Sequence, residues 1–471
     1  MTSSTDSPYH SPAGLPEQTE PPGDGTEVTR LADLSATQWK SGIAAWLGWL
    51  FDGLDMHLYT LVALPFVAEL SGFADFQSLS KVDKDLVSER AAWIQAAFLI
   101  GWALGGGFFG RIGDRIGRSR ALVLTILTYA CFTGLSYFAQ AWWHLLAFRF
   151  LAALGIGGEW AVGASLLSET WPRQWRPWVA AVLQTAVNCG VLLAAVAGFA
   201  LAGFSSRTVF LVGIAPALIV LWIRKAVPEP AEWHAARGGT GGTLPGVADL
   251  FRGEVRRVTV LTVIVCACSL TAHWAFTFWA PQHIKTVPEV ASWNDAEKQQ
   301  LVSVMLGVMM ISSIVGNFVA AALAKLMGYR KAIALMCAAY FMMMVFTYAV
   351  PRSHTQIVWC MWGLGGASGL FGLFTMFLPP LFPTLLRTTG AGFSYNIGRI
   401  AAAAGTLAFA LMFNVSNYGI ALICAAVLFL PAGAVVMLMP EPEERMKAEG
   451  GRRKDEGGRM KDEGGRMKDE G

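Results

Sequence analysis

Charged residues are scarce in this sequence. Only 15% of the 471 residues are Asp, Glu, Lys or Arg, whereas 54% are hydrophobic, and the mean hydropathy is +0.46. A typical soluble domain carries about 25% charged residues. The composition therefore excludes an ordinary set of soluble domains. It predicts a protein that crosses a lipid bilayer several times, and we expect no nucleic-acid partner.

The sequence also lacks the patterns of disulfide-rich proteins and of enzymes. Its seven cysteines lie in apolar runs without a C-x-x-C pair, so we expect packing residues, not disulfides or metal ligands. There is no G-x-S-x-G, no nucleotide loop and no His/Asp/Glu group with metal spacing. We therefore expect no enzyme activity, no metal and no cofactor. The start of the chain lacks the basic and apolar segments of a cleaved secretory signal.

Apolar runs of membrane-spanning length are what the sequence has in abundance. A transmembrane helix needs about 20 mainly apolar residues. Twelve such runs follow one another, at 43–68, 91–110, 120–140, 143–168, 178–203, 207–225, 258–280, 301–324, 332–350, 355–379, 389–413 and 418–439. The expected fold is therefore all-α and polytopic, with 12 transmembrane helices. Because Lys and Arg gather on the cytoplasmic side, we expect both termini there: 27 of the 36 basic residues then lie inside and 7 outside.

The chain resembles itself at an offset of 211 residues. This offset places Trp171–Ala180 on Phe382–Ala391 and Gly113–Arg120 on Ala324–Lys331. Repeated halves are common in transporters. We therefore expect two sequence-similar six-helix bundles, which divide the chain into five parts: a disordered cytoplasmic N-terminal tail (1–40), an N-terminal bundle (41–225), a cytoplasmic linker (226–257), a C-terminal bundle (258–440) and a low-complexity charged tail (441–471).

The charged tail has a period of seven residues from Gly450 onwards. Two glycines per unit and very few apolar side chains exclude a coiled coil, although the period would suit one. We expect a solvated, disordered cytoplasmic tail. A weak attraction of its basic residues to anionic lipid is the alternative.

A glycine-rich and charged motif joins the second apolar run to the third. The stretch "GRIGDRIGRSR" resembles the G-x-x-x-D-R-x-G-R signature of the major facilitator superfamily, in the expected loop and after the expected number of spans. The resemblance implies a charge cluster that locks the two halves in one conformation. Its gating residues are Gly110, Asp114, Arg115, Gly117 and Arg118. The second-half copy departs from the pattern, because Lys325 stands at the position of Asp114 and Tyr329 at that of Arg118.

Further segments support the same resemblance. "RFLAALGIGGEW" resembles a second signature of the superfamily, and "VPEPAEW" and "LFPTLLRTTGAGFSYNIGR" look like the branch that contains sialate, aromatic-acid and other metabolite:proton symporters. The resemblance implies a V-shaped pair of bundles, monomeric, that alternates access to a central cavity. It also implies an organic anion moved together with protons, with the proton gradient as the energy source.

Ionisable residues deep within the apolar runs are few, and their cost of insertion makes each a candidate for function. The acids are Asp52, Asp55 and Glu159, which we predict to couple proton movement. Asp55 lies about 18 Å into the first run, near the middle of a hydrocarbon core about 30 Å thick. Asp52 and Asp55 share one helical stripe with Tyr59, and neither has a basic partner three or four residues away. We therefore favour Asp55 as the proton carrier.

The basic residues in the apolar runs are Arg149 and Arg399. Arg399 has the planar fork that suits a carboxylate, with Tyr395 and Asn396 one turn away. Arg149 either binds an anion or pairs with an acid of the first run. The remaining predicted substrate-binding residues are Tyr59, Gln184, Asn188, His273 and Trp274. For Gln184 and Asn188 the alternative is hydrogen bonding between helices, and for the aromatic residues it is packing.

Together these features predict an inner-membrane secondary transporter. We expect proton-coupled symport of a small organic anion, such as a monocarboxylate, sialate or aromatic acid. A symporter of a sugar, polyol or other neutral solute and a drug:proton antiporter are the alternatives within transport. A membrane sensor is the alternative from another class, against which no soluble output domain remains outside the spans.

Overall fold

The computed structural model describes residues 30–73, 79–201, 205–238, 245–412 and 418–442, and every regular element in these ranges is a helix. The chain separates into two units, Met1–Ser35 and Ala36–Gly471. The first contains the short 3-10 helix η1 (Leu31–Asp33), and the second contains all the other described helices. Most of the two tails expected at 1–40 and 441–471 lies outside the described residues.

The first half of the large unit contains six helical passes, the last of them broken. Gly213 ends α6, and Pro216 begins α7 because proline is accepted in the first turn of a helix. The elements are α1 (Ala36–Leu70), α2 (Lys81–Ile116), α3 (Arg118–Ser136), α4 (Trp142–Thr170), η2 (Arg173–Trp175), α5 (Arg176–Ala200), η3 (Ser206–Thr208), α6 (Val209–Val212) and α7 (Pro216–Ala226).

Helix α1 bends where its sequence contains a proline. Ala36–Tyr59 and Val62–Leu70 meet at 56°. Pro65 lies one turn beyond the bend, and it has no N–H to donate to the carbonyl four residues earlier. The bend therefore follows from the sequence.

A linker and the second half complete the large unit. The linker carries α8 (Ala231–Gly238) and η4 (Val247–Phe251). The second half consists of α9 (Gly253–Lys285), η5 (Pro288–Val290), α10 (Asp295–Met327), α11 (Tyr329–Tyr348), α12 (His354–Ser368), α13 (Leu370–Phe377), η6 (Pro379–Leu381), η7 (Thr384–Leu386), α14 (Arg387–Met412), α15 (Tyr418–Val427) and α16 (Phe429–Val436).

The helices are long and apolar enough for a polytopic membrane protein. Among the described residues nine helices could each cross a membrane by length and hydropathy, and the bent α1 makes a tenth. Ten of the twelve apolar runs lie on these helices, the run 389–413 lies on α14, and the run 207–225 lies on the broken pair α6 and α7. A few residues at the ends of the runs 178–203 and 389–413 fall outside the described ranges. The prediction of an all-α, polytopic fold is confirmed.

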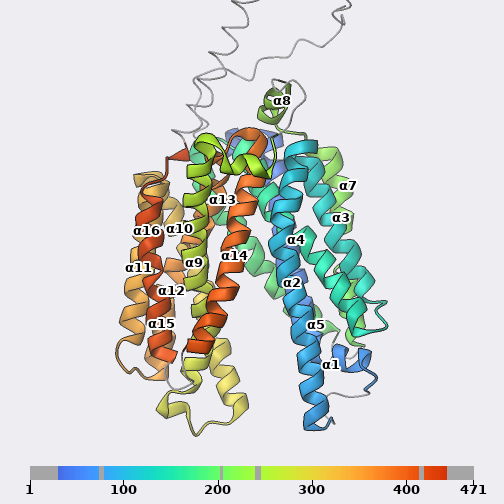
Figure 1. Ribbon diagram of the computed structural model, residues 1–471, viewed down its shortest axis with the longest axis vertical. Helices are drawn as coiled ribbons and strands as arrows, with labels where there is room; N and C mark the ends of the chain where they lie inside the picture. Colours follow the sequence, from blue (N-terminus) through green and yellow to red (C-terminus); the bar gives the residue numbers. More distant parts are fainter. Residues whose placement is uncertain (1–29, 74–78, 202–204, 239–244, 413–417, 443–471) are drawn as a thin grey trace, which may run out of the picture. The chain divides into compact units, whose positions relative to one another are not determined.

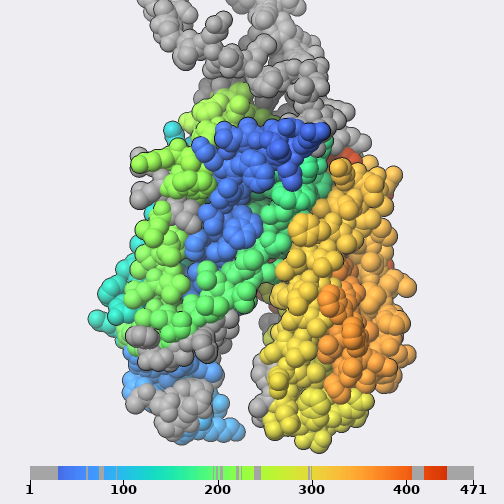
Figure 2. Space-filling view, turned by 180° about the vertical axis from the view of Figure 1, so that it is seen from behind, coloured from blue at the N-terminus to red at the C-terminus, as the bar shows by residue number. Residues whose placement is uncertain are grey.

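The helices pack into two groups that meet along two pairs of helices. In the first half α4 packs against α2 and α3, and α1 against α5; in the second half α9 packs against α14, and α10 against α12. The halves contact each other mainly through α2 with α14 and α5 with α10. Helix α8 lies at one end of the unit (Figure 1), which we call the linker end. The halves meet near this end, and a cleft separates them towards the opposite end (Figure 2).

Both halves end in the same capping device. Glu229, in a Pro-Glu-Pro sequence after α7, accepts hydrogen bonds from the backbone N–H groups of Ser119 and Arg120 at the start of α3, at 3.1 and 3.0 Å. Glu441, in a second Pro-Glu-Pro, does the same for Tyr329 and Arg330 at the start of α11, at 3.2 and 3.1 Å. A carboxylate stabilises a helix N-terminus, so the internal repeat extends to the ends of both halves.

Candidate functional site

A pair of acids lies between α1 and α4. Glu159 is completely buried and Asp52 is 8% exposed. Glu159 fits there because Gly48, one turn before Asp52, has no side chain: a Cβ at Gly48 would lie 1.6 Å from Oε1 of Glu159. The two carboxyl groups face each other closely enough to interact electrostatically. In the described part of the chain no other residue donates to either oxygen of Glu159 or to Oδ1 of Asp52.

Asp55 has a fixed cationic partner. Arg149 of α4 donates to both carboxylate oxygens of Asp55, at 3.2 and 3.0 Å, and to its main-chain oxygen at 3.2 Å. Thr133 of α3 also donates to Asp55. Both charged side chains are almost fully buried, and the ring of Phe98 lies 4.7 Å from the guanidinium. Of the two roles left open for Arg149, pairing with an acid of the first run is the observed one.

The stripe of α1 that carries the aspartates faces α4, because Asp52 contacts Glu159 and Asp55 contacts Arg149. Tyr59 is turned into the first half. Its hydroxyl donates to the carbonyl of Ala91 at 3.1 Å, and only 3% of the residue is exposed. In this conformation the hydroxyl and the surface of Tyr59 are used within the first half, and its contact with substrate stays a prediction.

Arg399 lies on the side of α14 that faces the first half. It donates to Oδ1 of Asn396 at 2.9 Å. Its guanidinium lies 3.8 Å from the ring centroid of Trp102 on α2 and 4.8 Å from that of Tyr395. Asp52 interacts with its charge across the interface. Within the described ranges, however, Arg399 forms no ion pair, in contrast to Arg149.

Asn396 is held against the first half. Its amide donates to the carbonyl of Gly392 at 2.8 Å, and a Cβ at Gly106 of α2 would lie 1.7 Å from that nitrogen. The glycine therefore allows α2 and α14 to approach at the level of Arg399. This close contact keeps the oxygen of Asn396 directed at the guanidinium.

Two aromatic rings stack across the interface beside these residues. Trp160 of α4 and Tyr395 of α14 lie nearly parallel, with ring centroids 4.2 Å apart. Trp49 of α1 also stacks with Trp160, with ring centroids 6.5 Å apart. Trp160 follows Glu159 directly in the sequence, and this adjacency to a buried acid was the signal that would have found it.

The structure separates the other predicted binding residues. Gln184 on α5 lies close to α13, because a Cβ added at Gly372 would lie 3.8 Å from the Cβ of Gln184. Asn188 lies one turn further along α5 and is half-buried. His273 points into the second half, where its Nδ1 lies 3.0 Å from the hydroxyl of Tyr340. Trp274 is 39% exposed. His273 is thus a packing residue here, in line with the alternative considered for it.

Asn317 on α10 is a polar residue that the sequence reasoning missed. It is 2% exposed, and neither polar atom of its amide has a hydrogen-bond partner in the described residues. It packs against Gly372, where a Cβ would lie 2.7 Å from its oxygen. Because it is a buried polar side chain without a hydrogen-bond partner among the described residues, Asn317 is a further candidate for substrate contact.

The gating motif closes the linker end. Gly117 has φ +108° and separates α2 from α3, and Gly110 lets α2 approach the carbonyl of Thr388. Asp114 accepts hydrogen bonds from the backbone N–H groups of Thr388 and Thr389, at 3.3 and 2.8 Å, in the first turn of α14. A carboxylate of the first half is thus held by a helix N-terminus of the second half, where the helix dipole favours it.

Two arginines from different halves share one buried carboxylate. Arg118 pairs with Glu169 at the end of α4 at 2.8 Å and with Asp114 at 3.0 Å. Arg387, the first residue of α14, pairs with the same oxygen of Glu169 at 3.0 Å. Asp114, Arg118, Glu169 and Arg387, with the first turn of α14, form what we call the latch. The sequence motif did not identify Glu169 or Arg387 as its members.

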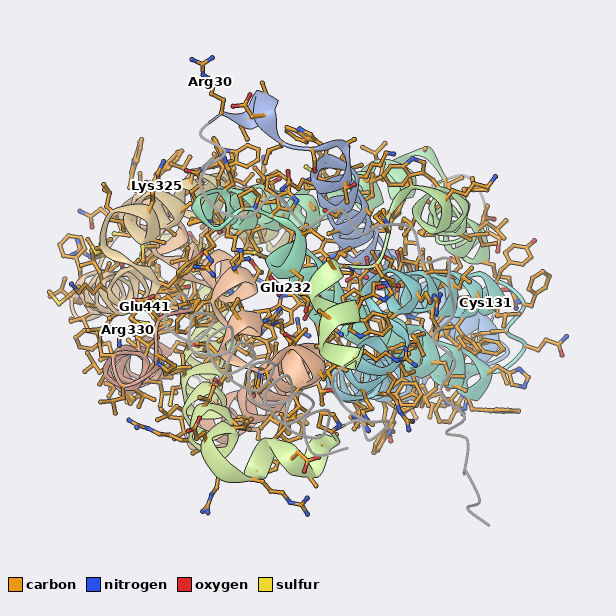
Figure 3. All side chains as sticks on the ribbon, turned by 90° about the horizontal axis from the view of Figure 1, so that it is seen from above. Arg30, Cys131, Glu232, Lys325, Arg330 and Glu441 are labelled. Carbon is orange, nitrogen blue, oxygen red and sulfur yellow. The ribbon has the colours of Figure 1, made fainter. Side chains whose placement is uncertain are left out.

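Helix α8 of the linker contacts the latch, and its Glu232 is labelled in Figure 3. Glu232 pairs with Arg387 at 2.8 Å. The indole of Trp233 donates to the carbonyl of Asp114 at 3.0 Å, and Arg237 donates to that of Arg115 at 3.0 Å. The linker therefore contacts both halves at the closed end.

The second half has no comparable latch among the described residues. Lys325, at the position that corresponds to Asp114, is exposed. Arg330 pairs with Glu441 of its own half at 3.2 Å, and the three residues are labelled in Figure 3. The asymmetry expected from the sequence is therefore present in the structure.

Comparisons with known proteins agree with this architecture. The family model described as Major Facilitator Superfamily matches residues 45–405. The sialic acid transporter NanX of Escherichia coli is 29% identical, over 83% of this chain and 91% of the relative. A probable 4-methylmuconolactone transporter of Cupriavidus pinatubonensis is 29% identical, over 78% and 81%. The solved structure of the proton:xylose symporter XylE superposes with a TM-score of 0.68 at 16% identity, over 86% of this chain and 96% of that one.

Proposed function

Because the chain belongs to the major facilitator superfamily, we propose that it is a secondary transporter that moves a small organic anion together with protons by alternating access. The observation that carries the proposal is the arrangement of the buried charged residues at the interface between the two halves. Arg399 has no acidic ion-pair partner among the described residues, and it lies across the interface from the two facing carboxyl groups of Asp52 and Glu159.

Arg399 is the proposed anion site. An unpaired guanidinium at the middle of a membrane is costly, and a carboxylate of the substrate supplies the missing partner with two parallel hydrogen bonds. Asn396 and the rings of Trp102 and Tyr395 hold the guanidinium in place. The named substrates of the relatives, sialic acid and 4-methylmuconolactone, support a small organic solute of this kind.

Asp52 and Glu159 are the proposed proton site. Two ionised carboxylates in contact repel each other, and neither can donate a hydrogen bond. A proton shared between them supplies the donor that both lack. Asp55, by contrast, is held by an ion pair with Arg149 and a hydrogen bond from Thr133. We therefore assign the proton to Asp52 and Glu159 in place of Asp55, which forms a fixed ion pair with Arg149.

The conformation also fits alternating access. The latch closes the linker end, and the cleft opens the other end (Figure 2). We propose that the linker end faces the cytoplasm of a bacterial cell with the protein in its inner membrane, because most basic residues then lie inside. The structure then corresponds to an outward-open state, and the protein is expected to act as a monomer with both termini inside.

Uptake into proteoliposomes tests the proposal. Labelled carboxylates and sugars are offered with and without an inward proton gradient. We expect the gradient to drive accumulation of at least one carboxylate and of no sugar. Arg399→Lys should raise the apparent KM for it by about tenfold or more, because a bidentate contact becomes a single one. Arg252→Lys is the matched control, since Arg252 is exposed in the linker.

The proton site is tested in the same vesicles. Asp52→Asn and Glu159→Gln should each abolish gradient-driven accumulation and retain exchange of labelled for unlabelled substrate. Accumulation of a sugar, or wild-type accumulation by both acid variants, would overturn the anion and the proton assignments respectively. If no solute moves at all, the membrane sensor becomes the better explanation.

A further inference from the structure

Tyr129 is a buried phenol that the proposed transport mechanism does not use. It lies on α3 and is completely buried, and its hydroxyl has no hydrogen-bond partner in the described part of the chain. An unpartnered buried hydroxyl is costly to keep. Its ring lies in the apolar core between α3, α2 and α4, with Trp102 and Ile156 among its neighbours in the cluster.

The backbone brings Tyr129 close to the acid pair. Gly155 of α4 lets the two helices touch, since a Cβ there would lie 2.9 Å from the backbone nitrogen of Tyr129. Glu159 follows Gly155 by one helical turn, so it lies on nearly the same face of α4. Tyr129 interacts electrostatically with Glu159 most strongly, and then with Asp52 and Asp55.

The other polar groups around the hydroxyl and the acid pair already have partners. Arg149 of α4 and Thr133 of α3 both donate to Asp55. Arg399 of α14 acts on Asp52 from across the interface and donates to Asn396. From α2 and α7 the cluster receives apolar side chains, such as Phe98 and Ile223. Tyr129 therefore has an O–H without an acceptor, and the nearby Asp52–Glu159 pair has oxygens without a donor.

We infer that Tyr129 donates a hydrogen bond to the Asp52–Glu159 pair when the pair has lost its proton, and so sets the pH at which the proton leaves. The inference rests on the proposed function. While the proton is bound, the two carboxyl groups satisfy each other. When it leaves, a small shift of the phenol side chain brings its O–H to the new carboxylate. Tyr129 is thus a positioning residue for the proton and does not contact the substrate.

The sign of the effect follows from which state receives the bond. A donor to the ionised acid stabilises that form, so its removal makes the pair hold its proton to higher pH. Hydrogen bonds to charged groups are among the stronger ones. Tyr129→Phe should therefore move the midpoint of proton release upward by about one pH unit, which is a tenfold change in proton affinity.

Infrared titration of the purified protein tests this without transport. The band of protonated carboxyl groups is followed against pH, and the part lost in Glu159→Gln is assigned to the pair. We expect the midpoint of that band to be about one unit higher in Tyr129→Phe than in the wild type. Tyr348→Phe is the matched control, because Tyr348 also has a buried hydroxyl without a hydrogen-bond partner in the described ranges but lies on α11 of the second half.

The outcomes separate the inference from the proposed function. An equal midpoint in Tyr129→Phe and the wild type, or an equal shift in Tyr348→Phe, would overturn the role of Tyr129 while leaving the proton site intact. If the wild type shows no band that Glu159→Gln removes, the pair binds no proton and both ideas fail. In proteoliposomes the pH for half-maximal gradient-driven uptake should shift with the band, while substrate exchange at low pH stays at the wild-type rate.

Discussion

Replacing Asp55 by Asn tests whether the acid favoured by the sequence is a proton carrier or half of a fixed ion pair. The substitution keeps the shape of the side chain and the main-chain bond from Arg149, but it removes the charge between Nη1 and the carboxylate oxygens. Arg149 cannot lose its own proton in compensation. A buried cation is therefore left without a counter-ion.

The size of the effect follows from that imbalance. Removing one partner of a buried ion pair costs roughly 3 to 5 kcal/mol. For a body of about 200 residues, the size of the first half, each kcal/mol lowers the melting temperature by roughly 2 to 4 °C, so Asp55→Asn should melt roughly 10 °C below the wild type. Arg149→Gln should cost less, because an unpaired Asp55 can bind a proton. The double variant should recover part of the loss.

Thermal melting in detergent, followed by tryptophan fluorescence, measures all three variants. Asp52→Asn is the control, since Asp52 lies one turn away on the same stripe and faces an acid instead of a base. It should melt at or slightly above the wild-type temperature, because it removes a repulsion. If Asp55→Asn and Asp52→Asn both melt within about 2 °C of the wild type, the Asp55–Arg149 ion pair contributes less than about 1 kcal/mol to stability. Asp55 would then be the better candidate for the proton carrier.

Three further predictions concern the close contacts and the latch. Gly48→Ala should abolish gradient-driven uptake and keep substrate exchange, because its Cβ would lie 1.6 Å from the facing carboxyl oxygen; uptake like the wild type would contradict this contact. Asp114→Asn should raise labelling of Thr388→Cys by a membrane-impermeant thiol reagent roughly fivefold, since a carboxylate at a helix N-terminus contributes about 1 kcal/mol; equal labelling would mean that the latch does not hold this end shut. Glu169→Gln should lower the melting temperature far more than Glu232→Gln, because the first removes the buried carboxylate shared by two arginines and the second breaks a partly exposed pair; equal losses would refute the ranking.

The spans could be predicted from the sequence because their causes are local, whereas the bend in α1 and the break between α6 and α7 were not predicted although local residues cause them. Runs of about 20 apolar residues define the spans, and Pro65, Gly213 and Pro216 mark the bend and the break by their own backbone restrictions. The latch was found for a related reason, since its glycines and charges are neighbours in one loop. Its other members, Glu169 and Arg387, are distant in sequence and could not be assigned from a local pattern.

The partners of the buried charges depend on which helices pack together, and a single helix does not contain that information. The spacing of Asp52 and Asp55 placed them correctly on one stripe but could not say that the stripe faces α4. Arg149 and Glu159 lie ten residues apart on α4, and each meets its own aspartate only once α1 and α4 are paired. The role of Gly48 is likewise invisible until Glu159 is seen to fill the space beside it.

Helix α14 joins the two ends of the proposed mechanism. Its N-terminus is held by Asp114, and Arg399 follows twelve residues after its first residue, about 18 Å further along the same helix. A proton shared by Asp52 and Glu159 removes one of their two negative charges, and a bound carboxylate neutralises Arg399. Substrate without the proton would leave two net negative charges at the interface, whereas both together restore the single net negative charge of the empty site. The latch then holds α14 against the first half together with the contact of Asn396 with Gly106 and the stack of Trp160 on Tyr395, so its strength helps to set how readily the fully loaded protein opens at the linker end.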